Sequence, residues 1–186
     1  NRRQRQMCIR DSALFDLASQ REVPIPLYAE MGSVNPQFVL PELVEANGEG
    51  FAESFFGSIT LGNGQFCTCP GMLFLLPGSD AVLEKLASLV ADSTGQPVLN
   101  EGICSAFDSG MSRLESLEGV QVLAKGTLEG AVVGAPAMVM KVSFADYVAQ
   151  REVLSEEVFG PSAVVVVCDE VAQFTEAARN FEGQLL

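Results

Sequence analysis

The sequence predicts an α/β fold with a mostly parallel sheet flanked by helices. From residue 13 onward, short apolar runs alternate with amphipathic stretches, which is the pattern of strands and covering helices. One run, residues 163–167, is rich in β-branched valine and follows Gly160-Pro161, as expected for a central strand buried on both faces. Hydrophobic residues make up 48% of the 186 residues, enough to build a core and to exclude a disordered chain.

Short apolar runs bounded by turn residues predict strands elsewhere in the chain. In chain order they are residues 25–29, 37–40, 72–76, 120–124, 132–133 and 137–142. The run at residues 72–76 is wholly apolar, which favours a buried strand. Gly134-Ala135-Pro136 separates the last two runs, because glycine and proline interrupt regular structure.

Apolar residues at helical spacing predict the covering helices. Within residues 44–61, Phe51, Phe55 and Ile59 recur at i, i+4 and i+8. The Pro-Gly-Ser-Asp turn at residues 77–80 then supplies a helix N-cap. The helix that follows has one apolar face, made of Val82, Leu83, Leu86, Leu89 and Val90. Two further helices are expected, one over residues 101–117 and one beginning near Asp169 with an inner face of Val171, Phe174 and Ala178.

The composition of the chain argues against some classes of binding partner and favours one cellular compartment. The net charge of −13 argues against nucleic acid, because binding there needs Lys and Arg to neutralise phosphates. The longest apolar run, residues 163–168, is far shorter than the roughly 20 residues that span a bilayer, so we expect no membrane segment. Five scattered cysteines and no secretory signal favour free thiols in the cytoplasm. Because the chain has no histidine, a Cys-His catalytic pair is excluded.

The first twelve residues differ from the rest of the chain. Residues 1–12 hold four of the eleven basic residues and continue none of the later periodicity. They also lack the apolar stretch of a signal peptide. We expect a non-native, disordered leader, with a solvated basic arm as the alternative.

Three segments join chemically capable residues to turn residues, and each follows or precedes a predicted strand. They are Tyr28-Ala29-Glu30-Met31-Gly32-Ser33-Val34-Asn35-Pro36, then Gly64-Gln65-Phe66-Cys67-Thr68-Cys69-Pro70-Gly71, then Glu156-Glu157-Val158-Phe159-Gly160-Pro161. Each has an ordinary interpretation when taken alone: a solvated strand-end acid, a core cysteine, and a charged loop before a sheet. Cys67 and Cys69 also allow a thiol-based metal or redox module. A zinc site needs four ligands, however, and without histidine or a second cysteine pair we expect no metal.

Taken together and in this order, the three segments resemble motifs of the aldehyde dehydrogenase family. The family's Glu-Leu-Gly-Gly motif is similar to residues 30–33, followed by the matching Asn35-Pro36. Its Gly-Gln-x-Cys motif is similar to residues 64–67, and its Glu-Glu-x-Phe-Gly-Pro motif to residues 156–161. The resemblance covers roughly residues 13–186 and implies an aldehyde-dehydrogenase-type catalytic domain.

The resemblance also implies residue roles. Cys67 would be the nucleophile, adding to the aldehyde to give a thiohemiacetal that becomes a thioester after hydride transfer to NADP or NAD. Glu30 would be the general base that activates water for hydrolysis of the thioester. Gly32, Glu157 and Phe159 would contact the cofactor, with Glu157 on the nicotinamide ribose hydroxyls.

Domain organisation, substrate and partners follow from the same resemblance. We expect residues 13–32 to end a cofactor-binding domain, and residues 33–186 to form a catalytic domain truncated at its C-terminal end and inactive alone. Ser33 replaces the second glycine of the commoner motif. With residues 66–71 and 97–103, it makes the chain similar to the branch that oxidises 2-oxoglutarate semialdehyde. A dimer or tetramer is the expected assembly. The alternative function is a non-catalytic relative that keeps the fold for oligomer contacts.

Overall fold

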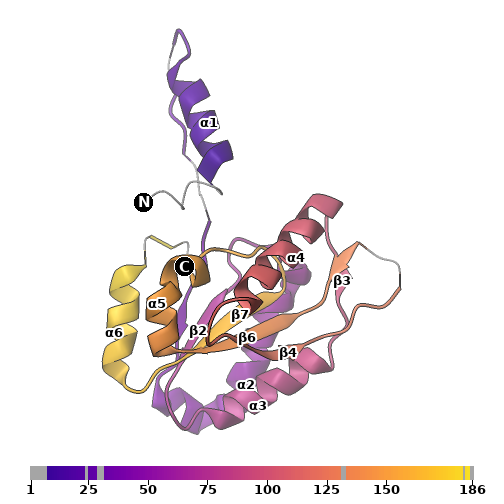
Figure 1. Ribbon diagram of the computed structural model, residues 1–186, viewed down its shortest axis with the longest axis vertical. Helices are drawn as coiled ribbons and strands as arrows, with labels where there is room; N and C mark the ends of the chain where they lie inside the picture. Colours follow the sequence, from indigo (N-terminus) through magenta and orange to yellow (C-terminus); the bar gives the residue numbers. More distant parts are fainter. Residues whose placement is uncertain (1–7, 24, 29–31, 131–132, 182, 185–186) are drawn as a thin grey trace.

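A five-stranded sheet forms the centre of the molecule. The computed structural model describes residues 8–23, 25–28, 32–130, 133–181 and 183–184 (Figure 1). The strand order is β1-β2-β7-β6-β4. The strand bounds are Gln37–Phe38 (β1), Met72–Leu75 (β2), Ser162–Val167 (β7), Met138–Ser143 (β6) and Gln121–Lys125 (β4). The first four strands run parallel, and β4 pairs antiparallel to β6 at one edge.

Helices cover both faces of this sheet (Figure 1). One face carries α2 (Pro41–Thr60) and α3 (Asp80–Ala91), and the other carries α4 (Glu101–Glu115), α5 (Phe144–Leu154) and α6 (Val171–Asn180). A short 3-10 helix, η1 (Leu61–Gly64), follows α2 directly. The remaining helix, α1 (Cys8–Ser19), projects away from the layered body.

Alternation along β2 shows why the sheet needs helices on both sides. Met72 and Phe74 belong to the core under α4, α5 and α6, whereas Leu73 and Leu75 belong to the core under α2 and α3. All four side chains are fully buried. Successive strand residues point to opposite faces, so a wholly apolar strand requires two apolar layers around it. The predicted α/β fold with a central parallel strand at residues 163–167 is therefore confirmed.

Two strand predictions were wrong in detail. Residues 25–28 form no strand, and the Tyr28 side chain is 92% exposed. Pro26 offers no backbone N–H, and this segment has no ladder partner among the described residues. Residue 29, the last of that prediction, lies outside the described residues. Gly134–Ala135, expected to separate two strands, is itself strand β5 and pairs antiparallel with β3 (Gln96–Pro97).

One helix prediction and one prediction of disorder also differ from the structure. The buried face of α6 holds Phe174 and Ala177, which are three residues apart and therefore lie on the same side of the helix, toward the sheet. Val171 and Ala178, which were predicted to face inward, are exposed. Residues 8–12, expected to be disordered, begin α1, because adding turns to an existing helix costs little once it is nucleated. Residues 1–7 of the expected leader lie outside the described residues.

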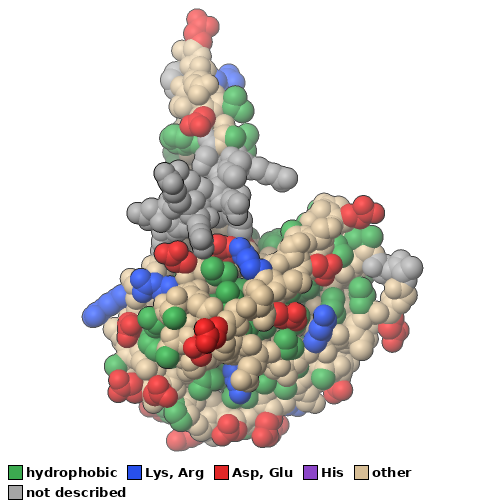
Figure 2. Space-filling model, viewed as in Figure 1, with side chains coloured by type: hydrophobic (Ala, Val, Ile, Leu, Met, Phe, Trp, Pro, Cys, Tyr) green, Lys and Arg blue, Asp and Glu red, His purple; other side chains and the backbone are tan. Residues whose placement is uncertain are grey.

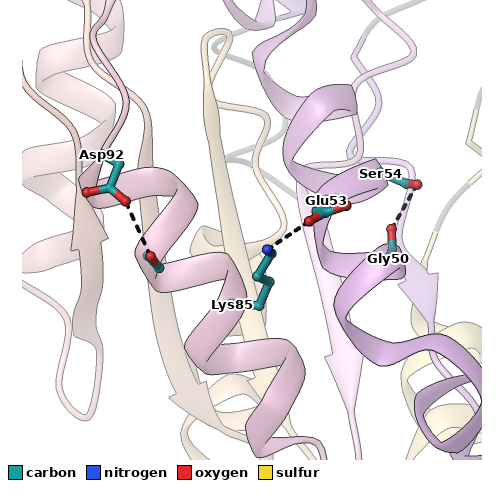
Figure 3. A network of polar contacts seen from close by, with 6 residues as sticks. Gly50, Glu53, Ser54, Lys85 and Asp92 are labelled. Carbon is teal, nitrogen blue, oxygen red and sulfur yellow. Dashed lines mark hydrogen bonds and ion pairs between the residues drawn. The ribbon is translucent and has the colours of Figure 1, made fainter.

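Charged side chains do not gather into one patch on the face that Figure 2 shows. In Figure 2, Asp and Glu side chains are spread over the visible face of the body, with fewer Lys and Arg between them. One ion pair bridges two helices: the Lys85 Nζ of α3 lies 2.7 Å from the Glu53 Oε1 of α2 (Figure 3). Within the described part of the chain, no helix has both the length and the apolar character needed to cross a bilayer.

Candidate functional site

The three sequence segments meet because each directly precedes one of three adjacent parallel strands. Residues 32–36 lead into β1, residues 64–71 into β2 and residues 156–161 into β7. Since β1, β2 and β7 are neighbours and run in the same direction, their amino ends share one edge of the sheet. This edge, which we call the amino edge, gathers residues from 32 to 161 into one place.

Asn35 holds the cysteine turn in position. Its side-chain Nδ2 donates to the backbone oxygens of Cys67, at 2.8 Å, and Cys69, at 3.0 Å. The Asn35 side chain is buried, at 3% exposure, and its backbone adopts φ 41°, a left-handed conformation that asparagine tolerates better than most residues. A buried amide that satisfies two carbonyl groups fixes the path of the loop it binds.

Backbone contacts lock the three segments together. The Gly71 N–H donates to the Val34 oxygen at 2.7 Å, which joins the first segment to the second. Gly64 packs so closely on the Gly160-Pro161 backbone that a Cβ at Gly64 would overlap it, which joins the second segment to the third. Gly64 also has φ +70°, so both its space and its conformation require glycine.

All three segments line one cavity of about 30 Å³. Its lining includes Ser33 of the first segment, Gly64 and Cys69 of the second, and Glu157 and Phe159 of the third. That volume accommodates about one water molecule. The floor is formed by apolar side chains of α4, α5 and β7, so the polar groups face a space with a nonpolar wall.

The two cysteines of the turn have different surroundings. Cys67 is exposed, whereas Cys69 is half-buried with its Sγ 3.6 Å from the Ser58 oxygen. Burial raises the pKa of the Cys69 thiol, and the nearby Glu157 carboxylate raises it further, although a backbone hydrogen bond with Phe66 opposes the rise. Cys67 is therefore the accessible sulfur of the pair, and Cys69 is held as a thiol.

Glu157 is a half-buried carboxylic acid at the cavity. Burial raises its pKa, and the hydrogen bond from the Ser33 backbone N–H partly counteracts this. The preceding Glu156 turns to α4, where its Oε2 lies 2.6 Å from Arg113 Nη1. The two glutamates thus differ: the Glu156 side chain is held in an ion pair, and the Glu157 side chain faces the cavity with a hydrogen bond from the Ser33 backbone.

Of the remaining predicted site residues, the structure describes Gly32 and Phe159 but not Glu30. Glu30 lies outside the described residues, so its position relative to Cys67 stays a prediction. Gly32 is exposed and has φ 117°, a conformation that favours glycine. The Phe159 side chain is 37% exposed and lines the cavity beside Glu157.

Sequence reasoning missed the residues that fix the site. The Gln184 Oε1 accepts from the Val34 N–H at 2.8 Å, from the Asn35 N–H at 3.1 Å and from the Ser33 hydroxyl at 3.2 Å. The Ser33 hydroxyl also lies 2.6 Å from Asn35 Oδ1. The Asn35-Pro36 pair signalled a turn, but no sequence signal linked it to Gln184, about 150 residues away in the chain.

A second set of contacts secures the start of the cysteine loop. The Gln65 side chain accepts from the Leu99 N–H at 2.9 Å and donates to the Gly62 oxygen, also at 2.9 Å. The Asn63 Nδ2 donates to the Gln96 oxygen at 2.7 Å and to the Ala135 oxygen at 3.2 Å. The β3–β5 pair therefore holds the start of this segment, in addition to the contacts that Asn35 makes with its later part. Across the described ranges, no three Cys, Asp or Glu side chains gather as potential metal ligands.

Comparison with known proteins shows which family and which curated proteins the chain is similar to. Residues 16–183 match the aldehyde dehydrogenase family. The chain is 36% identical over 180 residues to alpha-ketoglutaric semialdehyde dehydrogenase 2 of Azospirillum brasilense, which covers 93% of the chain and 33% of that protein. It is 33% identical over 175 residues to alpha-ketoglutaric semialdehyde dehydrogenase of Acinetobacter baylyi, with the same coverage of each. The chain thus spans about a third of the length of these curated relatives.

Solved structures agree on the fold. Proline utilization A of Bradyrhizobium japonicum superposes with a TM-score of 0.73 at 20% identity, covering 90% of this chain and 17% of that one. The NAD+ complex of aldehyde dehydrogenase from Bacillus cereus superposes with a TM-score of 0.63 at 20% identity, covering 80% of this chain and 31% of that one. From the family match over residues 16–183 and the relatives above 30% identity, the chain belongs to the aldehyde dehydrogenase family.

Proposed function

We propose that this chain is the catalytic part of a nicotinamide-dependent dehydrogenase that oxidises 2-oxoglutarate semialdehyde to the corresponding acid. The observation that carries the proposal is the convergence at the amino edge: the turn bearing Cys67, the Asn35 amide that fixes it and the Glu157 carboxyl meet at one place. The substrate class follows the names of the relatives from Azospirillum brasilense and Acinetobacter baylyi.

Cys67 acts as the nucleophile in this proposal. Its side chain is exposed, so an aldehyde can reach it, and the Asn35 hydrogen bond holds its backbone within the turn. The thiolate adds to the aldehyde carbon and gives a tetrahedral thiohemiacetal, from which hydride departs more readily than from a free carbonyl. Backbone N–H groups of the turn are the polar donors available to the developing oxyanion.

Glu30 is the proposed base for the second half of the reaction. It stands three residues before Ser33, whose loop is bonded to Asn35 and packs on the cysteine turn. A carboxylate there would take a proton from water as the water attacks the thioester, which releases the acid and restores the Cys67 thiol.

The described residues fit a nicotinamide cofactor on one side of the cavity. Glu157 presents a carboxylate that can accept hydrogen bonds from a pair of ribose hydroxyls, and the half-exposed Phe159 ring can contact a flat heterocycle. When bound, the cofactor would supply the hydride acceptor. Gly32, with no side chain and φ 117°, leaves the first segment open to a close neighbour. The choice between NADP and NAD belongs to the cofactor-binding domain that we propose precedes the catalytic part.

The test of this function uses the complete polypeptide that contains this sequence. We expect reduction of NADP or NAD with 2-oxoglutarate semialdehyde, and a lower kcat/KM with an unbranched alkyl aldehyde. Cys67→Ser should reduce kcat by at least about a thousandfold, because the hydroxyl is a much weaker nucleophile than the thiolate. Cys69→Ser is the matched control, in the same turn, and should retain most activity. Equal losses in the two variants would contradict the assignment of Cys67.

The variant Glu30→Gln tests the role of the base separately from that of the nucleophile. Without the base the thioester still forms but hydrolyses slowly, so a burst of reduced cofactor should precede a steady rate lowered by about a hundredfold or more. Rapid-mixing absorbance measurements give both phases. Unchanged steady-state turnover in this variant would remove Glu30 from the mechanism.

A further inference from the structure

We propose that Cys69 is a resolving thiol for Cys67, so that a hydroperoxide converts the pair into a reversible intramolecular disulfide. The observation is a Cys-x-Cys pair on one tight turn, with one sulfur exposed and the other sheltered. The proposal goes beyond the proposed function, because the sulfur chemistry needs neither an aldehyde nor a cofactor.

The turn brings the two cysteines within bridging range. The Cys69 N–H donates to the Phe66 oxygen at 3.1 Å, which closes a four-residue turn with Cys67 and Thr68 at its two central positions. Residues two apart in such a turn are closer than in an extended strand. Their Cα atoms are therefore expected within the range of about 4.4–6.8 Å that a disulfide requires.

Asn35 independently fixes the same geometry. A single nitrogen, Nδ2, contacts the oxygens of both Cys67 and Cys69, at 2.8 Å and 3.0 Å. The carbonyl groups of both cysteines must therefore point toward one buried amide nitrogen. In an extended Cys-Thr-Cys segment these two oxygens would lie too far apart to contact the same nitrogen. The turn is held in this form before any oxidation occurs, so closing the disulfide needs rotation of side chains rather than refolding of the loop.

The different surroundings of the two sulfurs assign their roles. Cys67 is exposed and would meet a dissolved hydroperoxide first. Cys69 is half-buried beside the cavity, where burial and the Glu157 carboxylate raise its pKa, so it is protected from direct oxidation as a protonated thiol. To bridge, its Sγ leaves the weak contact with the Ser58 oxygen at 3.6 Å and the backbone hydrogen bond with Phe66.

The reaction balances in two steps. The Cys67 thiolate attacks the terminal oxygen of the hydroperoxide and the O–O bond breaks, which leaves a sulfenic acid on Cys67 and an alcohol or water. Cys69 then gives up its proton and its thiolate attacks the Cys67 sulfur; the S–O bond breaks, and the departing hydroxide takes up that proton and leaves as water. A dithiol such as dithiothreitol supplies the two electrons that restore both thiols. The disulfide thus shields the proposed nucleophile from irreversible oxidation.

The other described cysteines do not share this arrangement. Cys168 is buried at the end of β7, where burial raises its pKa to about 12. Cys104 lies on α4, with its Sγ 3.3 Å from the Gly134 oxygen. Cys104→Ser therefore serves as a control that removes a half-buried thiol away from the turn.

The experiment treats the whole 186-residue chain with hydrogen peroxide and maps the products by mass spectrometry. We expect loss of about two thiols per chain, a disulfide within the peptide that contains residues 67 and 69, and full recovery with dithiothreitol. Cys104→Ser should behave as the unaltered chain does. In Cys69→Ser the same peroxide dose should drive Cys67 to sulfinic and sulfonic acids, which dithiothreitol does not reverse.

Two results would overturn the proposal. One is reversible sulfenic acid at Cys67 with no 67–69 disulfide in the unaltered chain. The other is equal overoxidation of Cys67 with and without Cys69. Neither depends on aldehyde turnover, so failure of the proposed dehydrogenase activity would be distinguished from failure of the disulfide.

Discussion

The two edges of the central sheet are built differently. At the amino edge, side chains bond across the chain: Asn35 reaches Cys67 and Cys69, and Gln184 reaches back to the loop before β1. At the opposite, carboxyl edge, several side-chain contacts are local, beside the backbone bond from the Cys168 N–H to the Leu75 oxygen at 2.8 Å. The Asp169 N–H donates to the side chain of Gln173, four residues later, and the turn at Pro77-Gly78 leads directly into α3.

The difference supports the proposal that the amino edge carries the chemistry. Open α/β sheets commonly bind ligands beyond the carboxyl ends of their strands. Here the half-buried acid, the exposed thiol and the left-handed backbone at Asn35 and Gly64 lie at the amino edge. Long-range side-chain bonds and close glycine packing fix that edge. The other edge also uses local side-chain bonds and turns. Substitutions at equivalent features of the two edges should therefore have unequal effects.

The largest difference is expected between Gly64→Ala and Gly78→Ala. Both glycines have positive φ, +70° and +88°, so each alanine carries the conformational cost of about 1–2 kcal/mol. At Gly64 the added Cβ also overlaps the Gly160-Pro161 backbone, whereas Gly78 has open space. We expect Gly64→Ala to lower the free energy of unfolding by about 3 kcal/mol or more, measured by urea denaturation. Similar losses for the two variants would contradict the close packing of the second and third segments.

A second comparison replaces one polar side chain at each edge. Asn35→Ala removes the two hydrogen bonds that Nδ2 donates to the Cys67 and Cys69 carbonyls and the one that Oδ1 accepts from the Ser33 hydroxyl. A loss of about 2–3 kcal/mol is expected. Gln173→Ala removes an exposed local bond and should cost about 0.5 kcal/mol. The rate of alkylation at Cys69 should rise only in Asn35→Ala, because the turn loosens. An unchanged rate there would mean that the amide does not hold the turn.

Glu157 makes a smaller contribution, seen in the pH dependence of stability. Burial raises its pKa in the folded state, so folding favours the protonated acid. The stability that this preference contributes is fully present below the unfolded pKa, near 4.5. It is lost as the pH rises through the folded pKa. Glu157→Gln should therefore gain stability relative to the unaltered chain between pH 4 and pH 7, in paired urea titrations. A relative loss over that range would contradict the burial of the acid.

The smallest effect is expected at Arg113. Its ion pair with Glu156 at 2.6 Å joins α4 to the third segment, but the side chains are 43% and 26% exposed. Solvent screens such a pair, so Arg113→Ala should cost about 0.5 kcal/mol, and less at high salt. If the loss persisted unchanged in 1 M salt, the contribution would be packing of the side chain rather than charge.

The sequence predicted the layers of this fold better than its connections. The valine-rich run of β7 and the apolar run of β2 identified buried strands, because full burial on both faces leaves no polar positions. The α5 helix was not predicted; its apolar face is weak, and Gln150 departs from helical backbone angles. Strand order could not be read from the chain, since pairing of β2 with β7 joins residues about 90 apart.

The site, like the fold, was predicted only where the signal lies within one short segment of the sequence. Motif order identified Cys67 and Glu157 as candidates, and their segments do converge at one cavity edge. The supporting residues were missed because their roles depend on distant partners. Asn35 resembled ordinary turn chemistry, and Gln184 had no local signal at all. Glu30 lies outside the described residues and remains a prediction.

The central claim is that the amino edge presents Cys67, and not Cys69, to an aldehyde. The most direct measurement is peptide mapping of the acyl group that accumulates on the Glu30→Gln variant of the complete polypeptide, with 2-oxoglutarate semialdehyde and cofactor supplied. The account predicts an acyl thioester on Cys67, located by fragment ions that separate residues 67 and 69. An acyl group on Cys69, or reduced cofactor without any acylated cysteine, would contradict it.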